Sequence, residues 1–218
     1  WGLPKAISQF SGMFAFALWD KKERSLHLTR DRIGEKPLYY GWMGKVLLFG
    51  SELKALRKHP AWQGEVHPDV LALFMQHGYV PSPYSIYKDI FKIKPGTLAT
   101  FTQNKISSLA PPEAESYWPA SELAKAGEAN PFQDDESAAI DQLDQLLADS
   151  VKQQMNADVP LGAFLSGGID SSAIVALMQK QSTRPVKTFT IGFHEENYNE
   201  AVHAKEVAKH LGTDHTEL

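Results

Sequence analysis

The chain has 218 residues, a hydrophobic content of 43%, a formal net charge of −4 and a pI near 6.1. This length suits one large or two small domains, and the scattered lysines and arginines exclude a stripe that binds polyanions, so we expect no nucleic-acid partner. The absence of cysteine excludes disulfides, thiolate zinc sites and a cysteine nucleophile from these residues.

Nothing in the sequence indicates a membrane partner. No apolar run approaches the roughly 18 to 20 residues of a membrane-spanning helix, and no charged-then-apolar leader opens the chain. We therefore expect a cytoplasmic protein. Because the chain starts at Trp1 and stops at Leu218, just after a predicted helix, we expect it to be an internal fragment of a longer protein.

The first part of the chain predicts short strands. Apolar and aromatic runs favour strands over 13–19, 25–29, 38–42 and 46–49, separated in part by charged or glycine-containing turns. Short connections of this kind predict an antiparallel meander. Large residues on both sides of the first strand predict that layers cover both faces of the sheet.

Two helices and two further strands are expected next. Ser51 is expected to cap a short helix, and Pro68 opens a second helix that Gly78 ends. An extended connector over 79–83 precedes two strands within 91–101, joined by a Pro-Gly turn.

The segment 107–133 is polar and rich in Pro, Glu, Ser and Ala, without clear periodicity. This composition is typical of an interdomain linker. We therefore expect one domain over 1–106 and a second over 134–218.

Helices and strands alternate in the predicted second domain. Asp134 or Asp135 is expected to cap a helix that packs on a core through the stripe Ile140, Leu143, Leu147, Val151 and Met155. A strand ending at Leu165, a helix, a strand over 186–193 and a helix closed by Gly212 follow. This order predicts a parallel sheet with right-handed crossovers, and ligands of such sheets bind beyond the carboxyl ends of the strands.

The most informative motif lies at the first of these strand ends, where the sequence reads LSGGIDSS from Leu165 to Ser172. Gly167 and Gly168 can adopt positive φ and let a ligand approach the backbone, while hydroxyls and an acid follow where free helix N–H groups point outward. The glycine pair alone favours an ordinary strand-to-helix turn, but the whole string favours a phosphate site. It lacks the Gly-Lys-Ser/Thr of a Walker loop.

This string resembles the pyrophosphate loop of N-type ATP pyrophosphatases, which include the asparagine, GMP, NAD and argininosuccinate synthetases. Upstream strings resemble the second half of the glutaminase domain of glutamine-hydrolysing asparagine synthetases: Gly12–Asp20, Arg30–Tyr40, Ser51–Leu56, Gly78–Pro81 and Lys94–Gly96. The resemblance continues through Phe189–Phe193, Asn199–Ala201 and His210–His215, and so covers nearly the whole chain except the predicted linker.

The resemblance implies an α/β plus α+β protein. Residues 1–106 would be the C-terminal part of an N-terminal-nucleophile (Ntn-type) αββα glutaminase domain. Residues 134–218 would begin a parallel-sheet ATP-pyrophosphatase domain, similar to the adenine nucleotide alpha hydrolases. The implied reaction is asparagine synthesis, in which ATP activates aspartate as β-aspartyl-AMP with release of pyrophosphate, and ammonia from glutamine displaces AMP. The implied partners are these small molecules and Mg²⁺, and a homodimer is compatible with the resemblance.

The same resemblance implies the site residues. Carried over by position, the ATP-binding residues would be Leu165, Ser166, Gly167, Gly168, Asp170, Ser171, Ser172 and Ile191. Asp170 would help to bind Mg²⁺, and Leu165 and Ile191 would contact the nucleoside through their backbones. The cysteine nucleophile and the glutamine-binding residues of the family would precede Trp1. No catalytic residue is therefore expected in this chain, and the isolated fragment is expected to be inactive.

Two other functions stay open at this point. The acceptor could differ, as in a β-lactam synthetase or an amidotransferase that modifies a sugar acid in polysaccharide synthesis, or the chain could bind a nucleotide without turnover.

Three other groups of residues invite a functional reading but favour a structural one. His203, His210 and His215 are expected to be surface or capping histidines rather than metal ligands. The pair Glu195-Glu196 is expected in a solvated loop, and Arg30 with Asp31 as a structural ion pair.

Overall fold

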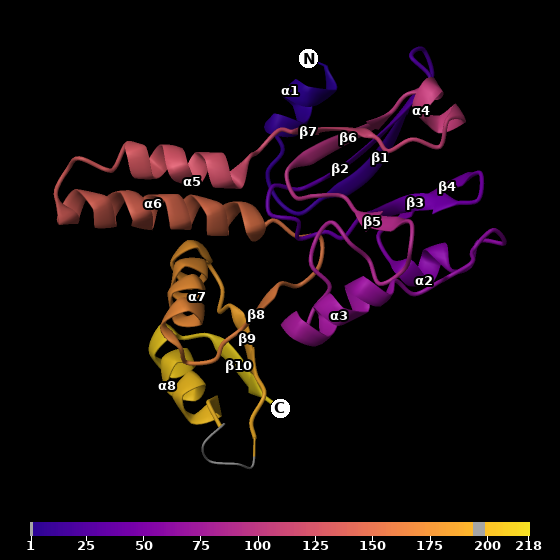
Figure 1. Ribbon diagram of the computed structural model, residues 1–218. Coiled ribbons are helices and arrows are strands. Elements are labelled where there is room, and N and C mark those ends of the chain that lie inside the picture. Colours follow the sequence, from indigo (N-terminus) through magenta and orange to yellow (C-terminus); the bar gives the residue numbers. More distant parts are fainter. Residues whose placement is uncertain (1, 194–198) are drawn as a thin grey trace. The chain divides into compact units, whose positions relative to one another are not determined.

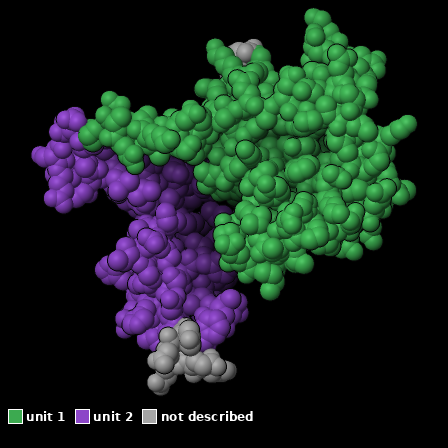
Figure 2. All heavy atoms as spheres, in the orientation of Figure 1, with its two compact units in different colours: residues 1–131 green, residues 132–218 purple. Residues whose placement is uncertain are grey.

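The computed structural model describes residues 2–193 and 199–218. The chain divides into two compact units, residues 1–131 and residues 132–218, which are coloured green and purple in Figure 2. Within the described residues, no helix combines the length and the apolar character that crossing a membrane requires.

The first unit contains two antiparallel sheets (Figure 1). One has the strand order β1 (Ala15–Asp20), β2 (Ser25–Arg30), β6 (Thr97–Phe101) and β7 (Glu113–Ser116). The other has the order β4 (Val46–Gly50), β3 (Tyr39–Met43) and β5 (Ile90–Lys92). The strand positions agree with the prediction to within a few residues. The prediction of a single antiparallel meander is wrong, because β2 and β3 lie in different sheets.

The chain changes sheets at two bends with a clear local cause. After β2, the N–H groups of Glu35 and Lys36 donate to the Asp31 carboxylate at 2.7 and 2.9 Å, so the backbone turns back instead of forming a hairpin. Between β5 and β6, Gly96 has φ 59° and its N–H donates to the Asp31 carbonyl at 2.9 Å. The two strands predicted within 91–101 therefore do not pair with each other.

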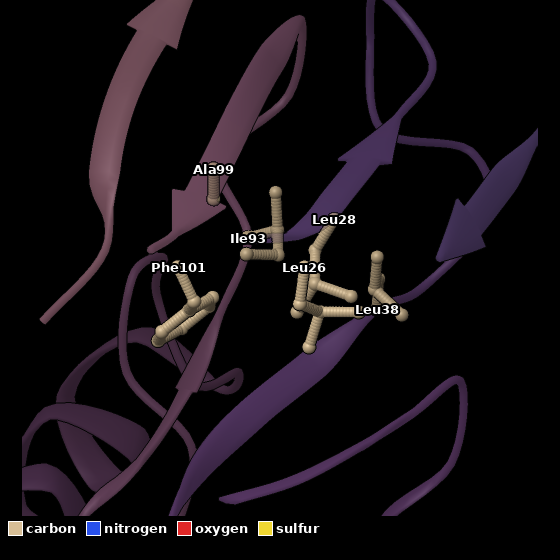
Figure 3. Close-up of a cluster of buried hydrophobic side chains, with 6 residues drawn as sticks. All are labelled: Leu26, Leu28, Leu38, Ile93, Ala99 and Phe101. Atoms are coloured by element: carbon tan, nitrogen blue, oxygen red, sulfur yellow. The ribbon is translucent and has the colours of Figure 1, made fainter. Parts of the chain in front are cut away.

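The main core of this unit joins the two sheets. Its buried residues come from β2, β6 and the segments beside β3 and β5, and Figure 3 shows them: Leu26, Leu28, Leu38, Ile93, Ala99 and Phe101. Tyr40 and Trp42 of β3 pack against them. A second cluster, built on Met43, Leu48, Leu56 and Ile90, also involves the second sheet and includes helix α2 (Leu53–Leu56).

The other helices of the unit are α1 (Leu3–Ser8), α3 (Pro68–His77), α4 (Gln103–Ser107) and α5 (Ala120–Ala129). Pro68 begins α3 and Gly78, with φ 74°, ends it, as predicted. The predicted cap of α2 is wrong, because Glu52 rather than Ser51 occupies the N-cap position and no side chain caps the helix. The segment 107–133 is more regular than a linker, since it contains β7 and α5.

The second unit alternates helices and strands: α6 (Glu136–Gln154), β8 (Gly162–Phe164), α7 (Ile169–Gln181), β9 (Lys187–Thr190), α8 (Ala201–Leu211) and β10 (Asp214–Glu217). The three strands pair in parallel in the order β10-β9-β8. Residues of α7 and α8 enclose Leu165 in one buried cluster, and Figure 1 shows both helices on the same side of the sheet. The chain thus ends on a strand, β10, and the prediction that it stops just after a helix is wrong.

Helix α6 begins as predicted but packs differently. The Asp135 carboxylate caps it by accepting from the Ala138 N–H at 2.9 Å. Of its apolar stripe, Val151 is buried, whereas Ile140 and Leu143 are 58% and 56% exposed. The prediction of one continuous core-facing stripe is therefore wrong for the first half of the helix.

Candidate nucleotide-binding site

The predicted phosphate loop connects β8 to α7 at the carboxyl end of the parallel sheet. A pocket of about 160 Å³ lies beside it, lined by Phe164, Leu165, Ser166, Phe189, Thr190, Ile191, Phe193 and Glu200. The structure therefore brings Leu165, Ser166 and Ile191 together, although Ile191 follows another strand. This is the edge of the sheet where ligands of parallel sheets bind.

Leu165 anchors the loop to the sheet. Its side chain is buried, its N–H donates to the Phe189 carbonyl at 2.9 Å, and its carbonyl accepts from the Thr190 hydroxyl. A nucleoside could use only the second lone pair of that carbonyl, so the backbone of Leu165 offers one further hydrogen bond. Ile191, in contrast, is exposed.

The two glycines of the loop differ in conformation. Gly167 has φ 79°, and a Cβ there would lie 2.8 Å from both the His203 Cβ and the Ala204 nitrogen. Gly168 has φ −72° and ψ 161°, which any residue can adopt, and it is the N-cap of α7. Of the two, only Gly167 uses the positive φ expected of both, and it does so to let the loop pack closely against α8.

A hydroxyl holds the loop in shape. The Ser171 Oγ lies 2.9 Å from the Ser166 Oγ and accepts from the Ser166 N–H at 3.2 Å. It also donates to the Gly168 carbonyl at 3.3 Å, while the Gly168 N–H donates to the Ser166 Oγ at 3.3 Å. This network fixes the backbone around the start of α7 before any ligand arrives.

The beginning of α7 fits an anionic group. No side chain of residues 2–193 or 199–218 caps this helix, and the first N–H groups of a helix have no acceptor within it. In the part of the chain that the structure describes, the buried Ser172 Oγ has no hydrogen-bond partner either. Donors without acceptors beside a helix N-terminus are what the phosphates of ATP would satisfy.

Asp170 is the acidic residue in the first turn of α7. Among the described residues, no three potential metal ligands gather into a group. Mg²⁺ is commonly bound by one or two carboxylates together with the phosphates of a nucleotide. Asp170 fits that arrangement as the single carboxylate of the loop.

The three histidine candidates take surface or structural positions. His203 and His210 are exposed on α8, and the Nδ1 of His215 lies 3.0 Å from the Thr188 hydroxyl. Glu195 and Glu196 lie outside the described residues.

Arg30 and Asp31 do not form the predicted ion pair. The Arg30 guanidinium donates to the carbonyls of Ile93 and Gly34, and the Asp31 carboxylate accepts from backbone N–H groups. The two residues are adjacent where β2 ends, and each holds a different part of the backbone.

The first unit contains a larger cavity, of about 530 Å³, for which no site residue was predicted. Its lining residues come from three of the strings that carry the resemblance: Met13, Phe14, Ala15, Phe16, Lys36, Pro37, Ser51 and Glu52. These residues were not predicted as a site, because none of the three strings contains a catalytic or binding pattern by itself. Only the fold brings the three together. In the pocket beside the loop, Glu200 was missed for the same reason, whereas the turn that contains Phe193 was expected at this edge of the sheet.

Comparisons with known proteins agree with both units. The family model described as a glutamine amidotransferase domain matches residues 1–118, and the asparagine synthase model matches residues 142–218. A putative glutamine-hydrolysing asparagine synthetase 2 of Methanocaldococcus jannaschii is 37% identical over 96% of this chain and 39% of its own length. Asparagine synthetase 1 of Bacillus subtilis is 34% identical over 96% of this chain and 31% of its own length.

A protein of Gibberella zeae named amidase chry2 is 29% identical over 95% of this chain and 31% of its own length. The chain thus spans less than two fifths of the length of these relatives. The two family models together leave only residues 119–141 unmatched. The chain therefore belongs to the family of glutamine-hydrolysing asparagine synthetases, with residues 1–118 in the glutamine amidotransferase domain.

Proposed function

We propose that this chain supplies the ATP-binding loop of an enzyme that makes asparagine from aspartate, ATP and ammonia released from glutamine. The observation that carries the proposal is the loop at 165–172, where, among the described residues, the Ser172 hydroxyl has no partner and no side chain caps the helix. The family membership supports the same reading. The proposal places the reaction in the cytoplasm, with small-molecule partners and a homodimer as a compatible assembly.

The loop residues would act on the leaving group. When the carboxylate of aspartate attacks the α-phosphate, pyrophosphate leaves with developing negative charge and β-aspartyl-AMP forms. The N–H groups at the start of α7 and the hydroxyls of Ser166, Ser171 and Ser172 would stabilise that charge. Mg²⁺, held by Asp170 and the phosphates, would neutralise part of it. Ile191 and Leu165 would hold the nucleoside beside the loop.

The proposal assigns each unit a part of the enzyme. Residues 1–106 would be the C-terminal part of an Ntn-type glutaminase domain, which the pair of facing sheets supports. The 530 Å³ cavity would form part of the region that handles glutamine or ammonia. Residues 134–218 would begin the ATP-pyrophosphatase domain, which the parallel order of β8, β9 and β10 supports.

Calorimetric titration of the chain with Mg²⁺–ATP tests the loop. We expect saturable binding, and we expect Ser171→Ala to weaken it at least tenfold, because this substitution removes the hydroxyl that holds Ser166 and Gly168 in place. The matched control is Ser150→Ala, at an exposed position on α6. Its affinity should equal that of the parent chain.

Equal affinity of the Ser171→Ala variant and the parent would contradict the proposed loop. So would the absence of binding by a parent chain whose circular dichroism shows that it is folded.

The acceptor is a separate question, because one matched relative is named an amidase rather than a synthetase. A β-lactam synthetase or a sugar-acid amidotransferase would use the same loop with another acceptor. Product analysis of a protein of the relatives' length that carries this chain, supplied with aspartate, glutamine and ATP, decides it. We expect asparagine, AMP and pyrophosphate; a folded protein that hydrolyses glutamine but forms neither asparagine nor AMP would exclude aspartate as the acceptor.

A further inference from the structure

A second cavity in the first unit takes only Tyr40 and Lys94 from the strings that carry the resemblance. It has a volume of about 300 Å³ and lies where β3, β5, β6 and β7 meet. Its lining residues are entirely different from those of the 530 Å³ cavity. This volume is at the lower end of the range for sites that bind small molecules.

The walls of this cavity are apolar. The ring of Tyr40 lies 5.9 Å from that of Phe91, centroid to centroid, and both residues line the cavity. Pro111 and Pro112 contribute further apolar wall from the segment before β7. Such surfaces favour the hydrocarbon body of a ligand.

The charged residues that line the cavity are all positive. They are Lys92 and Lys94, and no aspartate or glutamate lines it. Across the residues that the structure describes, neither lysine lies within 4.0 Å of a carboxylate oxygen. The Lys92 ammonium donates to the Val80 carbonyl, which holds it in place and leaves two of its three N–H donors for another partner.

A third cation, Arg30, lies in the core close to Lys92. Burial lowers the pKa of Lys92, and the nearby Arg30 guanidinium lowers this pKa further. Arg30 is 7% exposed and donates only to carbonyls, and its buried Nε has no partner among the described residues. The neighbouring Asp31 carboxylate stabilises the charge of Arg30, whereas Lys92 has no carboxylate within 4.0 Å among the described residues. A half-buried cation without an opposite charge is costly, so an anion beside Lys92 would be stabilised.

We propose that this cavity binds a small organic carboxylate with an apolar, preferably aromatic, body. The carboxylate would be held by Lys92 and Lys94, and the body would pack between Tyr40, Phe91 and the two prolines. Free amino acids fit poorly, because their ammonium group would face the same cations. The site is therefore distinct from any that takes aspartate or glutamine.

The test uses the 218-residue chain and two probes of the same shape, phenylacetate and the neutral phenylacetamide. We expect saturable chemical-shift changes with phenylacetate and an affinity at least tenfold higher than that of the amide. Phenylalanine, which adds an ammonium group, should bind at least tenfold more weakly than phenylacetate. Equal affinities for the acid and the amide would overturn the proposal, as would no saturable binding by the folded chain.

Three substitutions separate charge from shape. Lys92→Met should weaken phenylacetate binding at least tenfold and leave the amide unchanged, whereas Lys92→Arg should keep the preference for the acid. Ala114→Phe, at an exposed residue of the cavity wall, should abolish binding of both probes by filling the space. The control is Lys45→Met, at an exposed turn outside the cavity. Unchanged phenylacetate binding by Lys92→Met, or an equal loss in Lys45→Met, would refute the assignment.

Discussion

At the scale of single residues, Asp31 shows most clearly how one charged side chain can hold several backbone segments in place. Its carboxylate is almost fully buried and accepts from the N–H groups of Phe14, Glu35 and Lys36 at 3.3, 2.7 and 2.9 Å. Phe14 and Lys36 both line the 530 Å³ cavity. One side chain therefore ties together two walls of that cavity, which are far apart in sequence.

Burial alone would raise the pKa of Asp31, but the N–H groups of Lys36, Glu35, Gly34 and Phe14 outweigh it, so the pKa is lowered. A lowered pKa contributes stability above the unfolded value of about 3.9, and this contribution is lost as the pH falls through the folded pKa. Asp31→Asn should cost about 1 to 3 kcal/mol at neutral pH, because it weakens buried hydrogen bonds to a charge. Urea unfolding at a series of pH values measures this.

The variant should also lose less stability than the parent when the pH falls below about 4, because its side chain has no proton to gain. The control is Asp141→Asn, at an exposed position of α6. Parallel pH profiles for the parent and Asp31→Asn would refute the role of this carboxylate.

Alanine substitutions at Gly167 and Gly212 separate two costs to stability: a clash of the new Cβ with its neighbours, and strain in the backbone. Both have positive φ, 79° and 71°, but a Cβ would meet His203 and Ala204 at Gly167 and nothing within 4 Å at Gly212. Gly212→Ala should cost about 1 kcal/mol, from the strained conformation alone. Gly167→Ala should cost clearly more, because α8 must also move. Equal losses in thermal unfolding would show that the loop does not pack on α8 as described.

At the scale of elements, the sequence predicted helices better than strand partners. Helix starts such as Asp135 and Pro68, and stops such as Gly78, are local signals and were correct. The partition of strands into two sheets was not predictable, because it depends on contacts between β2 and β6, about seventy residues apart. The spacing of apolar residues within each strand does not indicate which distant strand it pairs with.

Two strands were missed for one physical reason. β7 reads Glu-Ala-Glu-Ser and β10 reads Asp-His-Thr-Glu, and each lies at the edge of its sheet. Their side chains are almost all exposed, so no hydrophobic alternation marks them. In α8, Ala201, Ala204 and Ala208 are buried and Val207 packs against the same cluster, while Val202 is 58% exposed.

Helix α6 gives a prediction at this scale. Val151 belongs to a buried cluster with Leu177, Met178 and Val186, whereas Leu143 is 56% exposed. Val151→Ala should cost about 1 to 3 kcal/mol, and Leu143→Ala should change the stability by no more than about 0.5 kcal/mol. Chemical unfolding followed by circular dichroism compares them. A larger loss for Leu143→Ala would mean that the first half of α6 packs on a core after all.

At the scale of the whole molecule, the two units would belong to two different steps of the proposed reaction. The first unit would be part of the domain that hydrolyses glutamine, and the second would begin the domain that binds ATP. The candidate site was largely predictable, because the string from Leu165 to Ser172 combines glycine, hydroxyl and acid in one local pattern. What could not be predicted was the contribution of Glu200 to the pocket and the crowding of Gly167 by α8. These depend on the order of strands in the sheet.

The loop from Leu165 to Ser172 is proposed to bind the phosphates of ATP. The most direct measurement is a comparison of Mg²⁺–ATP and AMP binding to the folded chain by titration calorimetry under identical conditions. Because AMP lacks the pyrophosphate that the start of α7 would hold, we expect Mg²⁺–ATP to bind at least tenfold more tightly. Equal affinities, or no binding of either nucleotide, would show that this loop does not hold the phosphates.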